Sequence, residues 1–227
     1  MSDDVDFDDY TDSYDRLLQY GTGFFSSNDR YFAQYKVDIV RKQMLAPVGR
    51  LLEYGCGIGR NISFLQKAFP DAVIVGSDVS RASLEIARRN NEGVEFFQEG
   101  VAVEASSPFD VIFVAGVFHH VPVVQRVGVA TALRERLSEN GSLFVFEHNP
   151  FNPVTRRIVS QCPYDKGTVL ISPFELKYLL AKSGWAVERT AYCLFVPPKL
   201  SLLARLESRL GWLPLGGQYW VHATPAI

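Results

Sequence analysis

The sequence predicts a doubly wound α/β fold, in which helices cover both faces of a mainly parallel sheet. Short β-rich runs alternate with helical stretches through most of the chain. Runs such as VIVGSD and DVIFVAG are almost entirely apolar, which is typical of parallel strands buried on both faces. A glycine-rich stretch, EYGCGIGR, joins the first predicted strand of the chain, which precedes both of these runs, to the helix that follows it. In such folds this turn lies at the edge of the sheet where ligands bind.

The individual elements follow from the same alternation. A helix is expected over residues 31–44, because its aromatic and aliphatic residues recur at near-helical spacing. Ser80 is a suitable N-cap for a later helix, and the Asn140–Gly141 pair is expected to end another. The expected strands are Arg50–Tyr54, Val73–Asp78, Val94–Glu99, Asp110–Ala115 and Ser142–Glu147, and the expected helices lie near Arg60–Ala68, Ser80–Asn90 and Val123–Ser138.

The C-terminal third predicts one more helix and two more strands. Ser172 is placed to cap a helix that Gly184 ends. The segments WAVERTAYCLFV and QYWVHATP are strand-like, and we expect them to form a hairpin added to the sheet edge. Between them, LSLLARLESRL has a one-sided apolar stripe, which is typical of a helix facing a core or a dimer partner. The chain is therefore expected to be a monomer or a homodimer.

Composition indicates an ordinary globular protein. The chain has 227 residues, of which 47% are hydrophobic and 21% charged, which is enough for a sizeable core. Its three cysteines form no CxxC pair, and the N-terminus has no basic and apolar leader pattern. No apolar run is long enough for a transmembrane helix. We therefore expect a cytoplasmic protein with no stable membrane anchor.

Charge is unevenly distributed along the chain. The net charge is −2, but residues 1–15 contain seven Asp and no Lys or Arg, so the remainder is modestly basic. The basic residues form no cluster, which argues against a nucleic-acid partner. We expect residues 1–45 to form an acidic tail and a helical cap, and residues 46–227 to form the main domain.

The glycine-rich turn predicts a nucleotide-type ligand. Glycine lets a ligand approach the main chain without meeting a Cβ atom, and the next helix presents free N–H groups. The spacing Gly55-x-Gly57-x-Gly59 departs from the G-x-G-x-x-G pattern for dinucleotides, and no G-K-[ST] follows as in a P-loop. Glu53 suits a cationic group rather than a pyrophosphate. Asp78 ends the second strand, where a carboxylate can accept hydrogen bonds from a ribose diol.

Four motifs together resemble a known family. In this order and spacing, LLEYGCGIGRN, VIVGSDVSRASLEIARR, VEFFQEG and FDVIFVAGVFHHV resemble the class I S-adenosylmethionine-dependent methyltransferases that act on small molecules. The resemblance covers about residues 48–150. It implies a Rossmann-like sheet of seven strands, in the order 3-2-1-4-5-7-6 with strand 7 antiparallel.

The resemblance also implies a set of S-adenosylmethionine contacts, with S-adenosylhomocysteine as the product. The chain has QEGVAVE where many relatives carry an Asp before the adenine-contacting residue, so contact there is expected to rest on main-chain atoms. A tyrosine of the leading segment, Tyr14 or Tyr10, is expected to cover the cofactor. The implied contacts are Glu53, Gly55, Cys56, Gly57 and Gly59 for the methionine part, Asp78 for the ribose, Val79, Gly100 and Val101 for the adenine, and Ala115 and Gly116 for the near side. Cys56 is read as a small filler rather than a nucleophile.

Three histidines are candidates for the catalytic chemistry. His119 and His120 follow the fourth strand and His148 follows the fifth, so all three are expected at the acceptor end of the cleft. Histidine is a suitable base near neutral pH if the acceptor has to lose a proton. We therefore slightly prefer O-methylation over N- or C-methylation, while a structural role for the His119–His120 pair stays open. No metal site is expected.

Residues 148–170 are expected to form a substrate loop or lid. Proline breaks regular structure there, and the Asn152–Pro153 pair can open a short helix through Gln161. Arg156 and Arg157 could pair with an anionic group of the acceptor, or they could be a solvated helix face. The acceptor is expected to be a small molecule, anionic or related to glycans or secondary metabolites. Two alternatives to a methyltransferase remain open for the function of the chain, namely a NAD(P)-dependent oxidoreductase and a non-catalytic sensor of an adenosyl ligand.

Overall fold

The computed structural model describes residues 30–101, 107–197, 207 and 209–226. The strands in this part are β1 (Arg50–Tyr54), β2 (Val73–Asp78), β3 (Glu95–Gln98), β4 (Phe109–Ala115), β5 (Leu137–His148), β6 (Trp185–Cys193) and β7 (Gln218–Pro225). The α-helices are α2 (Tyr31–Gln43), α3 (Ile62–Ala68), α4 (Arg81–Asn90), α5 (Arg126–Glu135), α6 (Pro153–Gln161) and α7 (Pro173–Lys182). Two short 3-10 helices are η2 (Val123–Gln125) and η3 (Pro163–Asp165).

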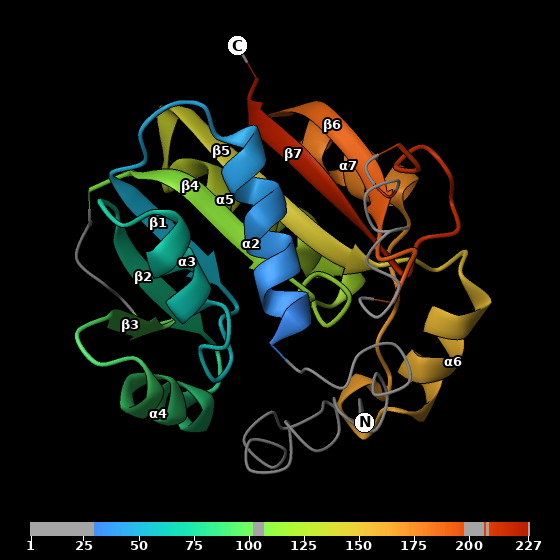
Figure 1. Cartoon of the computed structure of the whole chain (residues 1–227), viewed down its shortest axis with the longest axis horizontal. Helices are drawn as coiled ribbons and strands as arrows, with labels where there is room; N and C mark the ends of the chain where they lie inside the picture. Colours follow the sequence, from blue (N-terminus) through green and yellow to red (C-terminus); the bar gives the residue numbers. More distant parts are fainter. Residues whose placement is uncertain (1–29, 102–106, 198–206, 208, 227) are drawn as a thin grey trace.

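The strands form one seven-stranded sheet in the order β3-β2-β1-β4-β5-β7-β6 (Figure 1). The first five strands in this order are parallel to one another, whereas β7 pairs antiparallel with both β5 and β6. The predicted fold class, the strand order and the antiparallel seventh strand are therefore confirmed. The expected C-terminal hairpin is the β6–β7 pair.

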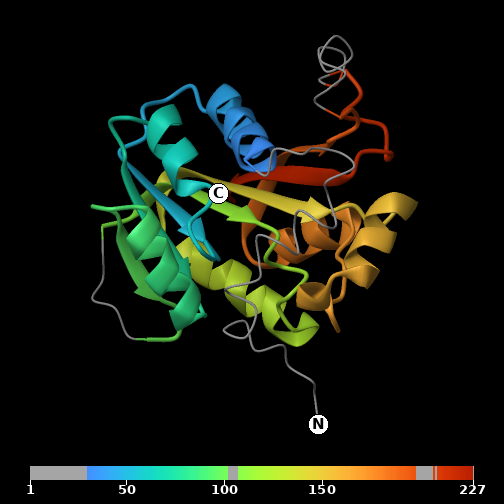
Figure 2. The ribbon, with the colours of Figure 1, turned by 60° about the horizontal axis from the view of Figure 1, so that its bottom comes forward.

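Helices cover both faces of the sheet. In Figure 2, α2 and α3 lie on one side of the strands, and α5 and α7 lie on the other. Neighbouring residues of one strand belong to opposite layers of the core, because strand side chains alternate between faces. Phe113 of β4 packs in the cluster with α2, α3 and α4, whereas Val114 packs in the cluster with α5 and α7. Each such buried side chain contributes roughly 1.5–3 kcal/mol relative to exposure.

Two helix starts follow the predicted capping chemistry. The Ser80 hydroxyl accepts a 3.0 Å hydrogen bond from the main-chain N–H of Ser83 at the start of α4. Ser172 and Glu175 form a capping box at the start of α7. Gly184 follows α7 with a φ of 78°, a left-handed conformation that ends the helix at low cost.

The predicted helix over Val123–Ser138 is too long. It begins as η2 and α5, ends at Glu135, and is followed at once by β5 from Leu137. Leu137 pairs with Phe109 of β4, and the register then shifts so that Val111 pairs with Ser142. The Asn140–Gly141 pair therefore lies in the irregular start of a strand instead of ending a helix. Burial of Leu137 in the core and its pairing with β4 outweigh the local turn signal.

Parts of the prediction lie outside the described residues. These parts are the whole acidic segment 1–15, which includes Tyr10 and Tyr14, and residues 200–206 and 208 of the expected amphipathic helix. Among the described residues, no helix combines the length and the apolar character needed to cross a bilayer. The division into residues 1–45 and 46–227 stays a prediction.

Candidate active site

A cleft of about 730 Å³ runs along the carboxyl ends of β1, β2 and β4. Parallel strands end at the same edge of the sheet, so segments distant in the sequence meet there. The cleft brings together most of the site residues predicted from the sequence. Those that line it are Gly55, Cys56, Gly57, Gly59, Asp78, Val79, Ala115, Gly116, His119, His120 and His148.

The three glycines of the turn after β1 all have left-handed φ angles, of 70°, 52° and 79° for Gly55, Gly57 and Gly59. Their surroundings differ. A Cβ at Gly55 would lie 2.4 Å from Val117 Cγ2, and one at Gly59 would lie 2.5 Å from Asn91 Nδ2. A Cβ at Gly57 would meet nothing within 4 Å. Two glycines therefore permit close packing, whereas Gly57 leaves its main chain open to the cleft.

Asp78 holds this turn in place. Its Oδ2 accepts a 2.7 Å hydrogen bond from the N–H of Gly57, and its Oδ1 accepts one of 2.9 Å from the N–H of Ser80. The N–H of Val79 also hydrogen-bonds to this carboxylate, which has about four acceptor positions, so about one is left for a ligand. Burial raises the pKa of Asp78, partly offset by these hydrogen bonds. The carboxylate is thus suited to accept from a hydroxyl of a vicinal diol.

Glu53 is buried behind the glycine turn. Asn61 donates a hydrogen bond to its Oε1, while Oε2 is buried without a hydrogen-bond partner. Burial raises the pKa of Glu53 to about 8, opposed by Asn61 and by the charge of Lys36. An unpartnered buried carboxylate oxygen is costly, and a cationic group beside it would offset that cost, although Glu53 itself does not line the cleft. This observation fits the ammonium of an adenosyl amino acid.

Only one of the three residues predicted to contact the adenine lines the cleft. The side chain of Val79 is 55% exposed and offers an apolar surface in the cleft. Glu99 also lines the cleft and is held by Arg136 through hydrogen bonds of 2.7 and 2.9 Å. Gly100 and Val101 follow it but do not line the cleft in this structure. Their assignment to the adenine stays a prediction.

The thiol of Cys56 is poorly suited to nucleophilic chemistry. It is buried, and burial together with the charge of Glu53 raises its pKa far above the usual range. The thiolate is the nucleophilic form of cysteine, so Cys56 is unreactive near neutral pH. This supports its interpretation as a filler.

The three predicted catalytic histidines meet at the other end of the cleft. The ring centroids of His119 and His120 are 4.1 Å apart, and those of His119 and His148 are 5.0 Å apart. The ring of Tyr164 lies edge-on to His120 at 5.1 Å. The fourth histidine, His222, stacks on Phe144 in β5 and contacts the hydroxyl of Ser142, consistent with a structural role.

A buried carboxylate holds His119. Glu147 Oε2 lies 2.7 Å from His119 Nδ1, and Oε1 accepts a 2.7 Å hydrogen bond from the N–H of Phe118. Burial disfavours the charged imidazole, but Glu147 and Asp165 outweigh it and raise the pKa of His119 to about 9. Burial opposes ionisation of Glu147, yet His119 lowers its pKa overall.

Asp165 joins the histidines from a distant segment. Its Oδ1 lies 3.5 Å from His119 Nε2 and 3.4 Å from His120 Nε2. Burial would raise the pKa of Asp165, but the histidines lower it well below the usual range. Burial lowers the pKa of His120, and it lowers that of His148 to about 4. The two carboxylates therefore border two neutral imidazoles and one that favours positive charge.

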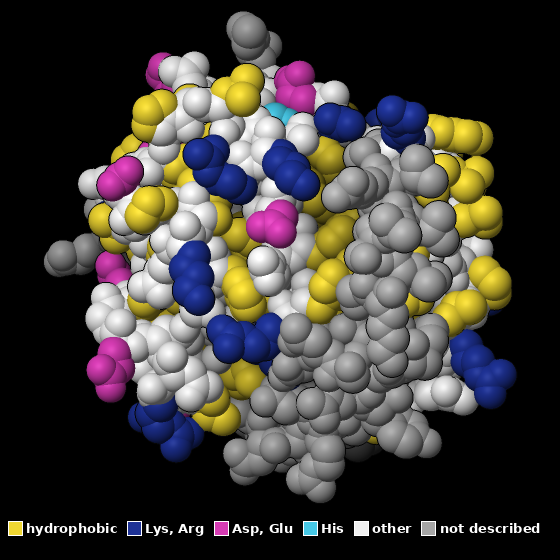
Figure 3. Space-filling view, in the orientation of Figure 1, with side chains coloured by type: hydrophobic (Ala, Val, Ile, Leu, Met, Phe, Trp, Pro, Cys, Tyr) yellow, Lys and Arg dark blue, Asp and Glu magenta, His cyan; other side chains and the backbone are white. Residues whose placement is uncertain are grey.

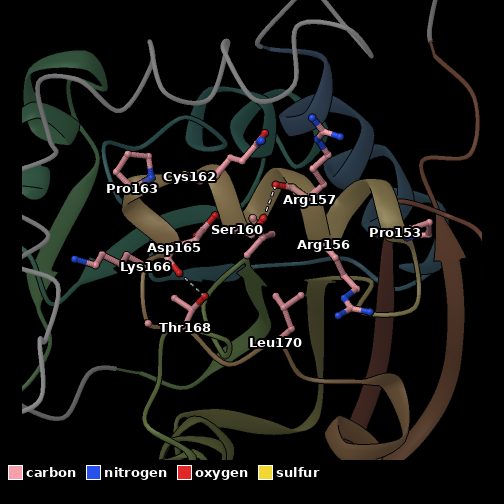
Figure 4. Close-up of a pocket in the computed structure, with 13 residues that line it drawn as sticks. Pro153, Arg156, Arg157, Ser160, Cys162, Pro163, Asp165, Lys166, Thr168 and Leu170 are labelled. Carbon is pink, nitrogen blue, oxygen red and sulfur yellow. Dashed lines mark hydrogen bonds between the residues drawn. The ribbon is translucent and has the colours of Figure 1, made fainter.

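A second cavity of about 920 Å³ adjoins the cleft, and Cys162 and Asp165 line both (Figure 4). Arg156 and Arg157 project from α6 in different directions along this second cavity. Neither arginine lines the cleft itself. The predicted substrate residues are thus close to the histidine cluster through Asp165, but on a separate surface.

The charges on the face of the molecule shown in Figure 3 are dispersed. Lys and Arg side chains are scattered among apolar and uncharged groups there, and they form no continuous basic patch. Three basic residues, Arg30, Lys36 and Arg60, instead line the cleft.

The residues of this site that the sequence did not predict include Lys36, Glu147, Tyr164 and Asp165, together with Arg30, Arg60 and Glu99 of the cleft lining. Glu147 directly precedes His148, so an acid beside a predicted catalytic histidine was a usable signal. Asp165 and Tyr164 belong to the segment over 148–170, which the sequence predicts to bind the substrate through Arg156 and Arg157. Lys36 has no local signal, because only the packing of α2 on the sheet brings it to the cleft.

Comparisons with known proteins identify the family of the chain. The pattern of a family described as "Methyltransferase domain" matches residues 27–190. A trans-aconitate 2-methyltransferase of Methylobacterium nodulans is 30% identical over 132 residues, which cover 56% of this chain and 50% of the relative. One of Acidovorax sp. is 28% identical over 173 residues, which cover 70% and 66%. The chain thus spans about half to two thirds of the length of these relatives.

Solved structures share the fold. A SAM-dependent methyltransferase of Thermotoga maritima superposes with a TM-score of 0.68 at 19% identity, covering 96% of this chain and 97% of the other. One from Mesorhizobium loti has a TM-score of 0.60 at 18% identity, covering 83% and 97%. The family match favours methyl transfer over the alternative of a NAD(P)-dependent oxidoreductase. The chain therefore belongs to the methyltransferase domain family and is a class I S-adenosylmethionine-dependent methyltransferase.

Proposed function

We propose that this protein transfers a methyl group from S-adenosylmethionine to a carboxylate oxygen of a small anionic acceptor. The observation that carries the proposal is one continuous cleft with two chemically different ends. The glycine turn and Asp78 lie at one end, and the histidine cluster lies at the other. Membership of the family supports the donor, and the nature of the acceptor is inferred from the cleft and from the relatives.

The cofactor end has features that fit an adenosyl amino acid. Gly57 leaves main chain open to the cleft, Asp78 has about one acceptor position left for a ribose hydroxyl, and Glu53 has an unpartnered oxygen for the ammonium. When bound, S-adenosylmethionine supplies a methyl group attached to a positively charged sulfur, which is a good neutral leaving group after transfer. The protein has to hold an acceptor atom in line with that methyl and displace water.

The lining of the cleft favours an anionic acceptor. Arg30 and Arg60 line it, and so does Lys36, whose pKa burial lowers; such basic groups bind carboxylates. The similar proteins named trans-aconitate 2-methyltransferases suggest a polycarboxylate as the first acceptor class to test. A carboxylate is already ionised near neutral pH, so its methylation needs positioning rather than a general base.

His119, His120 and His148 are assigned to holding the acceptor. Glu147 fixes the orientation of His119 through the 2.7 Å contact with Nδ1, so one ring of the cluster has little rotational freedom. Residues 148–170 are proposed as the substrate segment, because they supply both Asp165 and the arginines of the adjoining cavity. An acceptor with a second anionic group could reach that cavity.

The test is methyl transfer from isotopically labelled S-adenosylmethionine to a panel of acceptors. The panel contains trans-aconitate, cis-aconitate and citrate as polycarboxylates, their neutral amides, a phenol, and a primary amine. Transfer to a polycarboxylate is expected, with a product that releases labelled methanol in mild alkali, because a methyl ester is hydrolysed there. Methyl ethers and methylamines survive the same treatment.

The outcome also separates the alternatives. Alkali-stable transfer to the phenol or the amine alone would contradict a carboxylate acceptor. Binding of S-adenosylhomocysteine without transfer to any compound of a broad panel would favour the non-catalytic sensor. Cytoplasmic residence and the monomer or homodimer state stay predictions.

A further inference from the structure

We propose that His119, His120 and Asp165 bind one divalent transition-metal ion, represented by Zn²⁺, at the acceptor end of the cleft. Each residue offers one ligand atom, and the three atoms lie within 4.8 Å of one another. Two imidazoles and a carboxylate are ligands that Zn²⁺, Co²⁺ and Fe²⁺ accept, and catalytic zinc sites keep a fourth position open. Within the ranges that the structure describes, this is the one cluster of at least three His, Cys, Asp or Glu with such spacing.

The distances suit a shared metal better than direct hydrogen bonds. Asp165 Oδ1 lies 3.5 Å from His119 Nε2 and 3.4 Å from His120 Nε2. Nitrogen–oxygen hydrogen bonds are usually about 2.7–3.2 Å long. In a tetrahedral site with bonds of about 2.0–2.1 Å, neighbouring ligand atoms are roughly 3.4 Å apart. One oxygen at this distance from two nitrogens is the arrangement that surrounds a small cation.

His119 is oriented as metal-binding histidines usually are. Such a histidine commonly donates its other ring N–H to a carboxylate, which fixes the tautomer and the ring. Glu147 Oε2 lies 2.7 Å from His119 Nδ1, and Glu147 is itself held by the N–H of Phe118. With Nδ1 held by Glu147, Nε2 faces Asp165, and a metal ion would replace the proton that the raised pKa of His119 keeps on the ring.

A second observation points to a missing ligand. His119 is 2% exposed, and its buried Nε2 makes no hydrogen bond, although the Asp165 carboxylate lies 3.5 Å from it. Such atoms are rare in folded proteins because leaving them unpaired costs free energy. A metal ion bound to Nε2 would satisfy it. Two carboxylates, Glu147 and Asp165, border the histidines, and a dication would offset their charge.

The segment that carries Asp165 is held firmly. Thr168 donates both its main-chain N–H and its hydroxyl to the carbonyl oxygen of Asp165, at 3.1 and 2.8 Å (Figure 4). Val169, the next residue, donates its N–H to the carbonyl of His119 at 3.2 Å. The ligand from residues 148–170 is therefore fixed against the ligands that follow β4. The open position of the ion would face the cleft, where it could take an acceptor oxygen; this role, unlike metal binding, rests on the proposed function.

Metal binding is tested directly on the full chain after treatment with a chelator and without a methyl donor. Co²⁺ is titrated while visible absorption and heat release are recorded. One equivalent is expected to bind with the absorption bands of a low-symmetry, four- or five-coordinate site, and Zn²⁺ is expected to displace it. The result is independent of methyl transfer, so its failure leaves the proposed function intact.

Substitutions locate the site. Asp165→Asn and His120→Gln each remove a ligand and are expected to lower Co²⁺ affinity more than Glu147→Gln, which acts through His119 and should cost about 10–100-fold. His222→Gln removes a histidine outside the cluster, and Cys162→Ser removes the thiol beside Asp165. Both controls are expected to bind Co²⁺ like the unchanged protein. Circular dichroism and the melting temperature show which variants are folded.

Two results would overturn the proposal. One is a folded, unchanged protein that shows no saturable Co²⁺ binding. The other is binding that survives both Asp165→Asn and His120→Gln, since the ion would then sit elsewhere. Anomalous scattering from crystals grown with Zn²⁺ gives a check without substitutions, and a peak away from His119 Nε2, His120 Nε2 and Asp165 would count equally against the site.

Discussion

The carboxylate of Asp78 accepts a 2.7 Å hydrogen bond from the main-chain N–H of Gly57, which ties the end of β2 to the turn that follows β1. The residue proposed to bind the ribose therefore also shapes the turn proposed to bind the amino-acid part. Substitutions of Asp78 are therefore expected to change both the stability of the fold and the affinity for the ligand.

Replacing Asp78 by alanine is expected to weaken S-adenosylhomocysteine binding and to destabilise the fold. The change leaves two main-chain N–H donors, at Gly57 and Ser80, without their present acceptor, at a cost of about 1–3 kcal/mol. Calorimetric affinities should fall by at least about tenfold, or 1.4 kcal/mol. Asp71→Ala, at an exposed acid just before β2, is the matched control. Equal affinities for the two variants would contradict the ribose assignment.

Alanine substitutions at Gly57 and at Gly55 are expected to act mainly on different properties. The first should lower cofactor affinity, and the second should lower stability. Both positions have left-handed φ angles, so each substitution costs about 1–2 kcal/mol of stability. At Gly57 the new methyl group enters open space in the cleft and is expected to lower cofactor affinity at least about tenfold.

At Gly55 the methyl group meets Val117 at 2.4 Å, so roughly 1–3 kcal/mol of further destabilisation is expected. Chemical denaturation and calorimetry on both variants separate these effects. Normal cofactor affinity in Gly57→Ala would mean that the ligand does not lie against this turn.

The affinity for S-adenosylhomocysteine is expected to rise with pH up to about pH 8 through Glu53. Burial raises the pKa of this carboxyl to about 8, with Asn61, Lys36 of α2 and Asp78 of β2 facing it. Below that pH the free protein holds a proton on Glu53, which must leave before the carboxylate can accept the ligand's ammonium. Affinity should therefore fall by up to about tenfold per pH unit as the pH decreases.

Glu53→Gln provides the comparison for this pH dependence. The variant is expected to bind more weakly at pH 8 and to lose the part of the slope that Glu53 causes. Calorimetry in buffers of different ionisation enthalpy also counts the protons released on binding. An unchanged slope in Glu53→Gln would assign the titration to another group.

Charge reversal of Arg156 and Arg157 tests whether the adjoining cavity takes part in acceptor binding. With both changed to Glu, the KM for a polycarboxylate acceptor is expected to rise at least about tenfold, while the KM for S-adenosylmethionine stays the same. The exposed pair Lys42→Glu and Lys67→Glu changes the net charge equally, away from that cavity. An unchanged acceptor KM would mean that the arginines are a solvated helix face.

Much of the fold could be predicted because it follows from local pattern. The runs that became β1 and β2 have the predicted bounds, since uninterrupted apolar strands flanked by turns leave few alternatives. The caps of α4 and α7 depend on one hydroxyl and a nearby N–H, which the sequence shows directly. The end of α5 was misplaced because Leu137 pairs with a strand about 28 residues earlier in the chain.

The sequence alone predicted the family, the glycine turn, an acid at the end of the second strand and histidines after two neighbouring strands. Each of these features lies within a single strand and the turn that follows it, so it can be recognised without knowing which distant segments come into contact. Only the tertiary structure decided that Asp165 meets His119 and His120, that Glu147 orients His119, and that Lys36 reaches the cleft. Those contacts join segments separated by many residues, and they exist because α2 and residues 148–170 pack at the one edge of the sheet where the strands end.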